Sequence, residues 1–176
     1  MVPYRVHMKV TLVAAITADG YIGRNDSDLS LTWTSKEDKM FFRAISKEIG
    51  NLVVGSKTFA TFDRKILGRK FYVYSSRATI ENVHDNDVVL VQESPAEFVE
   101  KLAAQSVPGL LVAGGSSIYT QFMQAGVVDE LYFTIEPVLF GKGVPLFNSE
   151  ITAKITLIEV IRLSDQTNVF HYKVEK

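Results

Sequence analysis

One carboxylate in this sequence falls where a buried apolar residue would be expected. A helix that begins after Ser35 places Asp38 on the same face as Phe41, Phe42 and Ile45. Burial disfavours the charged form of a carboxyl group, so we expect a raised pKa for Asp38, as suits a proton donor or an anchor for a polar substrate. The alternative is structural, because Ser35 and Asp38 also have the spacing of an N-terminal capping box.

Two glycine-containing segments indicate binding of a phosphate or pyrophosphate. Each follows a predicted strand and opens a predicted helix, where glycine lets the backbone approach a ligand and the first helical amides favour an anion. The segment that starts at Gly114 is not a full dinucleotide fingerprint, and a plain tight turn is its alternative. The segments are Gly55-Ser56-Lys57-Thr58 and Gly114-Gly115-Ser116-Ser117.

Cations and hydroxyls recur at the ends of two neighbouring predicted strands. Lys57 follows one strand, and Ser75, Ser76 and Arg77 follow the next. A single solvated cation is usually only surface, but two such strand ends favour the 2′-phosphate of NADP over NAD, whose ribose more often meets an acid. Arg69, just before the second strand, could hold a carboxylate or phosphate through its planar guanidinium, and a solvated arginine is the alternative.

The elements that must position these residues alternate between strands and helices. We predict a helix from Ser35 that Gly50 ends, a short helix from Thr58, a helix over Pro95 to Gln105, and a helix that ends at Gly126. Helices between short buried strands imply an α/β fold with a mainly parallel sheet of about eight strands, closed by an antiparallel C-terminal hairpin. The predicted strands cover residues 10–16, 52–54, 71–74, 88–91, 110–113, 130–136, 155–163 and 169–174.

Composition narrows the class of protein. The 176 residues, with 47% hydrophobic and 22% charged side chains, suit a single domain over 1–176. A net charge of −1 argues against a nucleic-acid partner, and the lack of cysteine with only three scattered histidines (His7, His84 and His171) argues against a metal site. The start is too polar for a signal peptide and no apolar run could span a membrane. We therefore expect a cytoplasmic protein, a monomer or homodimer, whose partner is a small-molecule substrate.

Taken in order, these segments resemble dihydrofolate reductase over nearly the whole chain. The resemblance implies the three-layer α/β/α fold of that family and NADPH-dependent reduction of 7,8-dihydrofolate to tetrahydrofolate. It also implies that a cis peptide joins Gly114 and Gly115. The matching segments are 13–23, Trp33 with Asp38 and Phe42, 54–59, 67–70, 75–77, 113–119 with 121–122, and 131–134.

The resemblance also implies a role for each matching residue. Asp38 would bind the amino-pyrimidine edge of the pterin and promote protonation of N5 while the nicotinamide delivers hydride to C6. Thr134 would hydrogen-bond Asp38, Arg69 would hold the glutamate tail, and the loop Gly23 to Thr32 would be a mobile lid. The cleft would be lined by Ala15, Ile22, Trp33 and Phe42. The cofactor would contact Ala15, Ile22, Gly55, Ser56, Lys57, Thr58, Ser75, Ser76, Arg77, Ala113, Gly114, Gly115, Ser116, Ser117, Ile118 and Tyr119.

Two alternatives stand beside this main expectation. Residues 127–131 and 136–143 resemble the reductase domain of riboflavin biosynthesis, which shares the fold and reduces the ribosyl group of an aminouracil phosphate with NADPH. In that case Arg69 would bind phosphate instead of carboxylate. A nucleotide-binding module without catalysis is the other alternative, and a carboxylate on an apolar helix face argues against it.

Overall fold

The computed structural model describes residues 8–28, 30–80 and 84–176. Helices α1, α3 and α4 and the eight main strands lie where the sequence pattern predicts them, with ends that shift by one or two residues. The elements in chain order are β1 (Lys9–Thr17), β2 (Tyr21–Gly23), a 3-10 turn (Ser30–Thr32), α1 (Lys36–Ile49), β3 (Asn51–Gly55), α2 (Ser56–Phe59), β4 (Lys70–Tyr74), β5 (Asp87–Val91), α3 (Pro95–Ala104), β6 (Gly109–Val112), α4 (Ser116–Gln124), β7 (Glu130–Glu136), β8 (Val144–Pro145), β9 (Ile155–Arg162) and β10 (Asn168–Val174).

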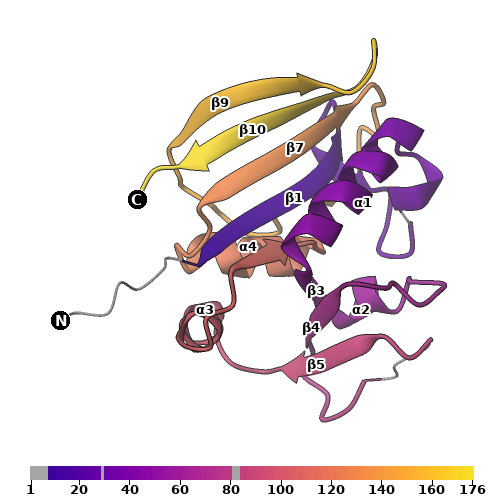
Figure 1. The fold of residues 1–176 in the computed structure, drawn as a ribbon. Coiled ribbons are helices and arrows are strands. Elements are labelled where there is room, and N and C mark those ends of the chain that lie inside the picture. The colour runs from indigo at the N-terminus through magenta and orange to yellow at the C-terminus, as the bar shows by residue number, and fades with distance from the viewer. Residues whose placement is uncertain (1–7, 29, 81–83) are drawn as a thin grey trace.

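An eight-stranded sheet forms the centre of the molecule, in the order β5-β4-β3-β6-β1-β7-β10-β9 (Figure 1). All neighbours from β5 to β7 pair in parallel, whereas β10 runs antiparallel to both β7 and β9. The predicted mostly parallel sheet with an antiparallel C-terminal hairpin is therefore confirmed. Its parallel strands end at one common edge, where a ligand site is expected.

Helices cover both faces of the sheet, because alternate strand residues point to opposite sides. On one face, Val54 and Val73 pack with the apolar stripe of α1 and with α2. On the other, Val53 and Tyr72 pack with α3 and α4. This arrangement confirms the three-layer α/β/α fold, and Figure 1 shows α1 lying along the sheet beside β1.

A small second sheet, formed by β2 and β8, is absent from the sequence prediction. Its strands of three and two residues are too short to show a pattern, and a tertiary contact holds them together. The carboxylate of Asp19 accepts hydrogen bonds from Thr17 Oγ1 at 2.6 Å and from the amides of Phe140 and Gly141. The turn after β1 is thereby tied to the loop before β8.

Two further differences concern local structure. Helix α2 begins at Ser56, two residues before the predicted start at Thr58. The predicted lid, Gly23 to Thr32, contains a 3-10 turn and an Arg24–Asp28 ion pair, while its residue Leu29 lies outside the described residues, as does His7. Within the described ranges no helix is both long and apolar enough to cross a membrane.

Candidate functional site

Helix α1 carries Asp38 to the carboxyl edge of the sheet, and its first turn is held there by a side chain of β7. The Ser35 hydroxyl caps the helix by accepting the Asp38 amide at 3.1 Å. The same hydroxyl and the Ser35 amide both donate to Glu136 Oε1 at 2.8 Å. The predicted capping box is thus only half present: Glu136, and not Asp38, receives the Ser35 amide, so the Asp38 carboxylate stays available for other contacts.

The Asp38 carboxyl group is buried, with 8% of the residue exposed. Desolvation raises its pKa, a hydrogen-bonding contribution from Thr134 lowers it, the negative charge of Glu136 raises it, and Thr34 lowers it, with a net raised value. This outcome agrees with the prediction from its position on the apolar helix face. A larger fraction of Asp38 is therefore protonated near neutral pH than for an exposed aspartate.

The buried hydroxyl of Thr134 lies close to this carboxyl group, and the buried indole N–H of Trp33 lies in the segment just before α1. Within the described part of the chain, Trp33 Nε1 and Thr134 Oγ1 make no hydrogen bond of ordinary geometry. Thr134 faces Asp38 and pairs in strand register with Ala15, while the Trp33 ring stands edge-on to Phe140 at 5.2 Å. An unsatisfied buried polar atom costs about 1–3 kcal/mol, so these two atoms are suited to meet a polar ligand.

The second half of the edge is formed by the ends of β3, β4 and β6. The Gly55 amide donates to Gly114 O at 2.8 Å, which brings the two glycine segments together. A cis peptide joins Gly114 and Gly115, as the resemblance implies. Helices α1 and α3 are capped by serine side chains, but α2 and α4 follow the N-cap residues Gly55 and Gly115, which provide no side-chain cap. The first amides of α4 are therefore available to an anion.

The residues around this helix start fit a dinucleotide. A Cβ at Gly115 would lie 3.3 Å from Thr58 Oγ1, so backbone and hydroxyl form one close surface. At the end of β4, the buried Tyr74 hydroxyl has no hydrogen-bond partner within the described residues. Next to it stand Ser75, Ser76 and Arg77, and Arg77 is exposed. Hydroxyls, free amides and a cation at adjacent strand ends are the donors that a phosphorylated nucleotide requires.

Some predicted cofactor residues are already engaged inside the protein. The Tyr119 hydroxyl donates to Val13 O at 2.8 Å, and the Ser116 hydroxyl donates to Pro145 O at 2.7 Å. Ile118 packs 3.3 Å from the position of a Cβ on Gly55. Lys57 is largely exposed and lies 3.4 Å from Asp26, a weak surface pair. Contacts of all these residues with a cofactor remain predictions.

The residues predicted to bind the substrate lie in different surroundings in the structure. Ala15 lies beside Thr134, Phe42 packs in the core under α1, and Ile22 packs against the other core. The Arg69 guanidinium donates to Arg43 O at 2.7 Å, Leu67 O at 2.9 Å and Ser46 Oγ at 3.1 Å. The Arg69 guanidinium is therefore held in place by contacts within the protein. The sequence predicted a guanidinium that binds a ligand and gave no sign of these contacts.

Arg43 next to Arg69 is a feature that the sequence reading missed. Burial and the charge of Arg43 lower the pKa of Arg69, so two guanidinium groups lie near one another. Neither makes an ion pair with a carboxylate of the described residues. Arg69 also borders a surface hollow of about 350 Å³ together with Lys65, Lys70 and Asp87. The sequence gives no sign that Arg43 and Arg69 are neighbours, because Arg43 lies on α1 and Arg69 lies in the segment before β4.

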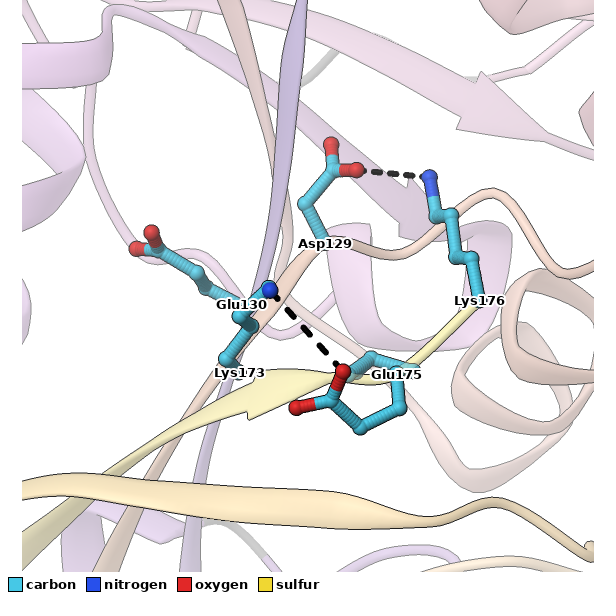
Figure 2. A pocket seen from close by; sticks show the side chains of 6 residues that line it. Asp129, Glu130, Lys173, Glu175 and Lys176 are labelled. Carbon is cyan, nitrogen blue, oxygen red and sulfur yellow. Dashed lines mark hydrogen bonds and ion pairs between the residues drawn. The ribbon is translucent and has the colours of Figure 1, made fainter.

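A second hollow, shown in Figure 2, lies at the opposite edge of the sheet. Its charged lining residues are already paired: Lys176 with Asp129 at 2.6 Å and Lys173 with Glu175 at 3.8 Å, while Glu130 pairs at 2.8 Å with Lys9, which is not part of the lining. Its charges are compensated locally, so the site is assigned to the carboxyl edge with Asp38.

Comparison with known proteins identifies the relatives of this chain. The family model described as the RibD C-terminal domain matches residues 8–169. The uncharacterized protein YyaP of Bacillus subtilis is 27% identical over 155 residues, covering 79% of this chain and 80% of its own length. A dihydrofolate reductase of Aedes albopictus is 22% identical over 137 residues, covering 72% of each chain.

Solved structures agree on the fold. A structure assigned to riboflavin biosynthesis, from Shewanella sp. PV-4, has a TM-score of 0.81 and 23% identity, covering 96% of this chain and 100% of its own. A diaminohydroxyphosphoribosylaminopyrimidine deaminase/5-amino-6-(5-phosphoribosylamino)uracil reductase from Thermotoga maritima has a TM-score of 0.74 and 18% identity, with 96% of this chain matching 57% of that one. At these identities the likeness is one of fold.

These comparisons correct the main sequence expectation. The chain was expected to reduce dihydrofolate, and that reading is wrong: the matching family is the RibD C-terminal domain, the second resemblance, carried by residues 127–131 and 136–143. The dihydrofolate reductase motifs gave the shared superfamily fold correctly. They could not separate the two families because both share that superfamily fold.

Proposed function

The chain belongs to the RibD C-terminal domain family, and from that membership we propose that it is an NADPH-dependent reductase of a phosphoribosylamino-pyrimidine. The substrate class is that named for the Thermotoga maritima relative of the same fold, a 5-amino-6-(5-phosphoribosylamino)uracil. The family supports an oxidoreductase in general, and the identity of the substrate and of NADPH is our proposal.

The observation that carries this proposal is the surroundings of Asp38. A buried carboxyl group with a raised pKa lies beside the buried Thr134 hydroxyl, and Trp33, in the segment just before the helix cap, carries a buried indole N–H without a hydrogen-bond partner among the described residues. These groups offer one donor from the indole, one donor or acceptor from the hydroxyl, and one acid. A polar heterocycle with donors and acceptors on its rim would satisfy them, whereas an apolar ligand would leave them unpaired.

The reaction needs a proton as well as a hydride. The bond from C1′ to the ring oxygen breaks as that oxygen takes a proton, which leaves C1′ double-bonded to its nitrogen as an iminium. C1′ would then receive the hydride that bound NADPH supplies, giving the open ribityl chain and NADP⁺. We assign the proton to Asp38, because a carboxyl group with a raised pKa is a better donor near neutral pH than an ordinary aspartate.

The uncapped start of α4 would hold the cofactor pyrophosphate, with the Thr58 hydroxyl beside it. Ser75, Ser76 and Arg77 would receive the 2′-phosphate, and exposed Lys57 would add a positive charge. The phosphate group of the substrate would lie near Arg43 and Arg69, which have no carboxylate partner in the described part of the chain. Guanidinium groups suit phosphate oxygens because their N–H groups can bind two oxygens at once.

The decisive measurement is the oxidation of NADPH by the purified protein with 5-amino-6-(5-phosphoribosylamino)uracil. The wild type should oxidise NADPH, and Asp38→Asn should lose about 10²- to 10⁴-fold in kcat while still binding NADPH. Asp38→Asn with near-normal turnover would reject the role of Asp38. Tight NADPH binding without oxidation would instead support a binding module, and dihydrofolate serves as the comparison substrate.

We also propose a cytoplasmic location, a single domain over residues 1–176, a small-molecule partner and neither nucleic acid nor membrane as a partner. For the oligomeric state we keep both monomer and homodimer. The edge strand β9 exposes apolar side chains such as Leu157 and Ile158, at 49% and 50%. Sedimentation velocity over a range of protein concentrations distinguishes the two states.

A further inference from the structure

Glu136 is a buried carboxylate that the proposed reaction does not use. It ends strand β7 with 2% of its surface exposed, and the sequence analysis gave it no role. Its two oxygens accept hydrogen bonds from Ser35 N and Ser35 Oγ at 2.8 Å, and from Thr167 Oγ1 at 3.5 Å. A group that only accepts hydrogen bonds has the pattern of an ionised carboxylate.

The contacts of Glu136 lead directly to Asp38. Ser35 donates its hydroxyl to Glu136 and accepts the Asp38 amide at the same oxygen. The two carboxylates are therefore linked by one serine, across 101 residues of sequence between Ser35 and Glu136. Any shift of Glu136 moves the cap, and with it the first turn of α1 that carries Asp38.

A neutral side chain would serve the cap equally well. The amide oxygen of a glutamine could accept both Ser35 donors, whereas burying a charge costs free energy even when it is hydrogen-bonded. The geometry of the cap therefore does not require the charge, although the charge strengthens these hydrogen bonds at the helix start. The charge also acts on the other carboxyl group of the site, since the negative charge of Glu136 disfavours ionisation of Asp38.

Among the described residues, charged or titratable groups face Asp38 from the elements around it. Glu136 approaches from β7, Lys39 from α1 itself and Tyr119 from α4. Lys39 favours ionisation of Asp38, and the Tyr119 hydroxyl is neutral because burial raises its pKa. Among these groups, Glu136 is the one whose charge favours the protonated acid.

We propose that Glu136 is a positioning residue that fixes Asp38 through the Ser35 cap and holds a negative charge near the Asp38 carboxyl group. The use that the protein makes of the Asp38 proton rests on the proposed reductase function. The link between Glu136 and Asp38 does not, because it can be measured in the protein without substrate.

The test is the titration of Asp38 in the Glu136→Gln variant. Carboxyl ¹³C NMR of the full chain, with the Asp38 signal assigned by its loss in Asp38→Asn, gives the titration midpoint without any turnover. In Glu136→Gln the cap bonds can persist while the charge is gone, so the midpoint of Asp38 should fall by on the order of one pH unit. Glu130→Gln, a carboxylate at the far end of the same strand, should leave it unchanged.

Two further variants keep the result interpretable. Ser35→Ala removes the capping hydroxyl but keeps the Glu136 charge, so the Asp38 midpoint should stay raised while kcat falls. If Glu136→Gln is poorly folded by circular dichroism, Glu136→Asp, which keeps the charge on a shorter side chain, should retain a raised midpoint. An unchanged midpoint in folded Glu136→Gln would overturn the proposal.

Activity provides an independent readout. The protonated acid is the active form, so the rate should fall as pH rises through the Asp38 midpoint. In Glu136→Gln this alkaline limb should move to lower pH with little change in KM. A protein that shows the NMR shift but reduces none of the substrates would contradict the proposed function and leave the role of Glu136 intact, so the two failures are separable.

Discussion

Trp33 carries a buried indole N–H that makes no hydrogen bond within the described residues. Its ring is held edge-on against Phe140, over which the guanidinium carbon of Arg24 lies at 4.3 Å. The ring is thus fixed by packing, while its polar atom is left for a ligand. The chemistry of this single residue can be separated from its packing by substitution.

We expect Trp33→Phe to keep the aromatic packing and to lose only the N–H donor. Because that donor has no protein partner, the free energy of unfolding should change by less than about 1 kcal/mol. The KM for the pyrimidine substrate should rise roughly fivefold, as loss of one hydrogen bond implies. Denaturant unfolding and steady-state kinetics measure the two effects. Loss of stability with unchanged KM would show that the indole N–H is not used.

Arg43→Gln tests the phosphate end of the substrate. Arg43 is exposed, so the change removes a charge beside Arg69 without breaking the bonds that Arg69 makes to backbone oxygens. The KM for the phosphorylated substrate should rise about tenfold, because a charge-assisted contact is lost. The KM for the dephosphorylated substrate should not change. Lys47→Gln, also exposed on α1, is the matched control, and an equal effect there would reduce the result to general surface charge.

At the scale of elements, the helices differ in how they begin. Ser35 and Ser94 cap α1 and α3, and Glu97 completes the capping box of α3. Helices α2 and α4 follow the N-cap residues Gly55 and Gly115 without such a cap, at the carboxyl edge of the parallel strands. The uncapped amides at the start of α4 are a feature of the element and not of any one side chain.

Gly115→Ala should therefore impair cofactor binding more than folding. The added Cβ would lie 3.3 Å from Thr58 Oγ1, on the surface assigned to the pyrophosphate. We expect the Kd for NADPH to rise at least about tenfold, equivalent to about 1.4 kcal/mol. Fluorescence titration with NADPH measures this value.

Gly126→Ala is the control at the other end of the same helix. Gly126 has φ +66° and a Cβ there would meet nothing within 4 Å, so the substitution strains the backbone but leaves the ligand surface alone. It should cost about 1 kcal/mol of stability and leave the Kd for NADPH unchanged. Equal loss of NADPH binding in both variants would mean that α4 acts only through the stability of the fold.

For the molecule as a whole, a polar cluster joins the C-terminal hairpin to the parallel sheet. His171 of β10 contacts Glu130 of β7 at 3.0 Å and Glu159 of β9 at 3.2 Å, and its ring stacks on Tyr132. Burial acts to raise the pKa of Glu130, but hydrogen bonds and charges from Lys9 and His171 outweigh it and lower the pKa. Glu130 therefore binds its proton less readily folded than unfolded.

The sign of the resulting pH dependence follows from that lowered pKa. The contribution of Glu130 to stability is fully present above the ordinary value of 4.5 and is lost as pH falls through the lower, folded value. The difference in unfolding free energy between wild type and Glu130→Gln should be about 1 kcal/mol at pH 7 and shrink below pH 4.5. Urea unfolding from pH 7 to pH 3 measures it, with exposed Glu100→Gln as the control. A constant difference would contradict the assignment.

A single cooperative transition at pH 7 is also expected if residues 1–176 form one domain.

The sequence alone determined the local elements and singled out Asp38. Ser35 and Gly50 mark the ends of α1 because a hydroxyl that caps amides and a residue at φ +75° act within one helical turn. Asp38 stood out because one charge among Phe41, Phe42 and Ile45 breaks a periodic pattern. The shared superfamily fold could also be predicted, since the alternation of strands and helices depends on patterns among neighbouring residues.

Only the tertiary structure decided how distant residues meet around that acid. Glu136 receives the Ser35 amide, Arg43 comes beside Arg69, and β2 pairs with β8, and each contact depends on sheet order and on the path of loops. The one hint available was that Glu136 shares a strand face with Thr134. The sequence pattern shows which face of a helix or strand a residue occupies, because the repeat of the backbone sets that face. The residue that it meets on the facing element is set by the packing of distant segments, such as Ser35 and Glu136, which are 101 residues apart.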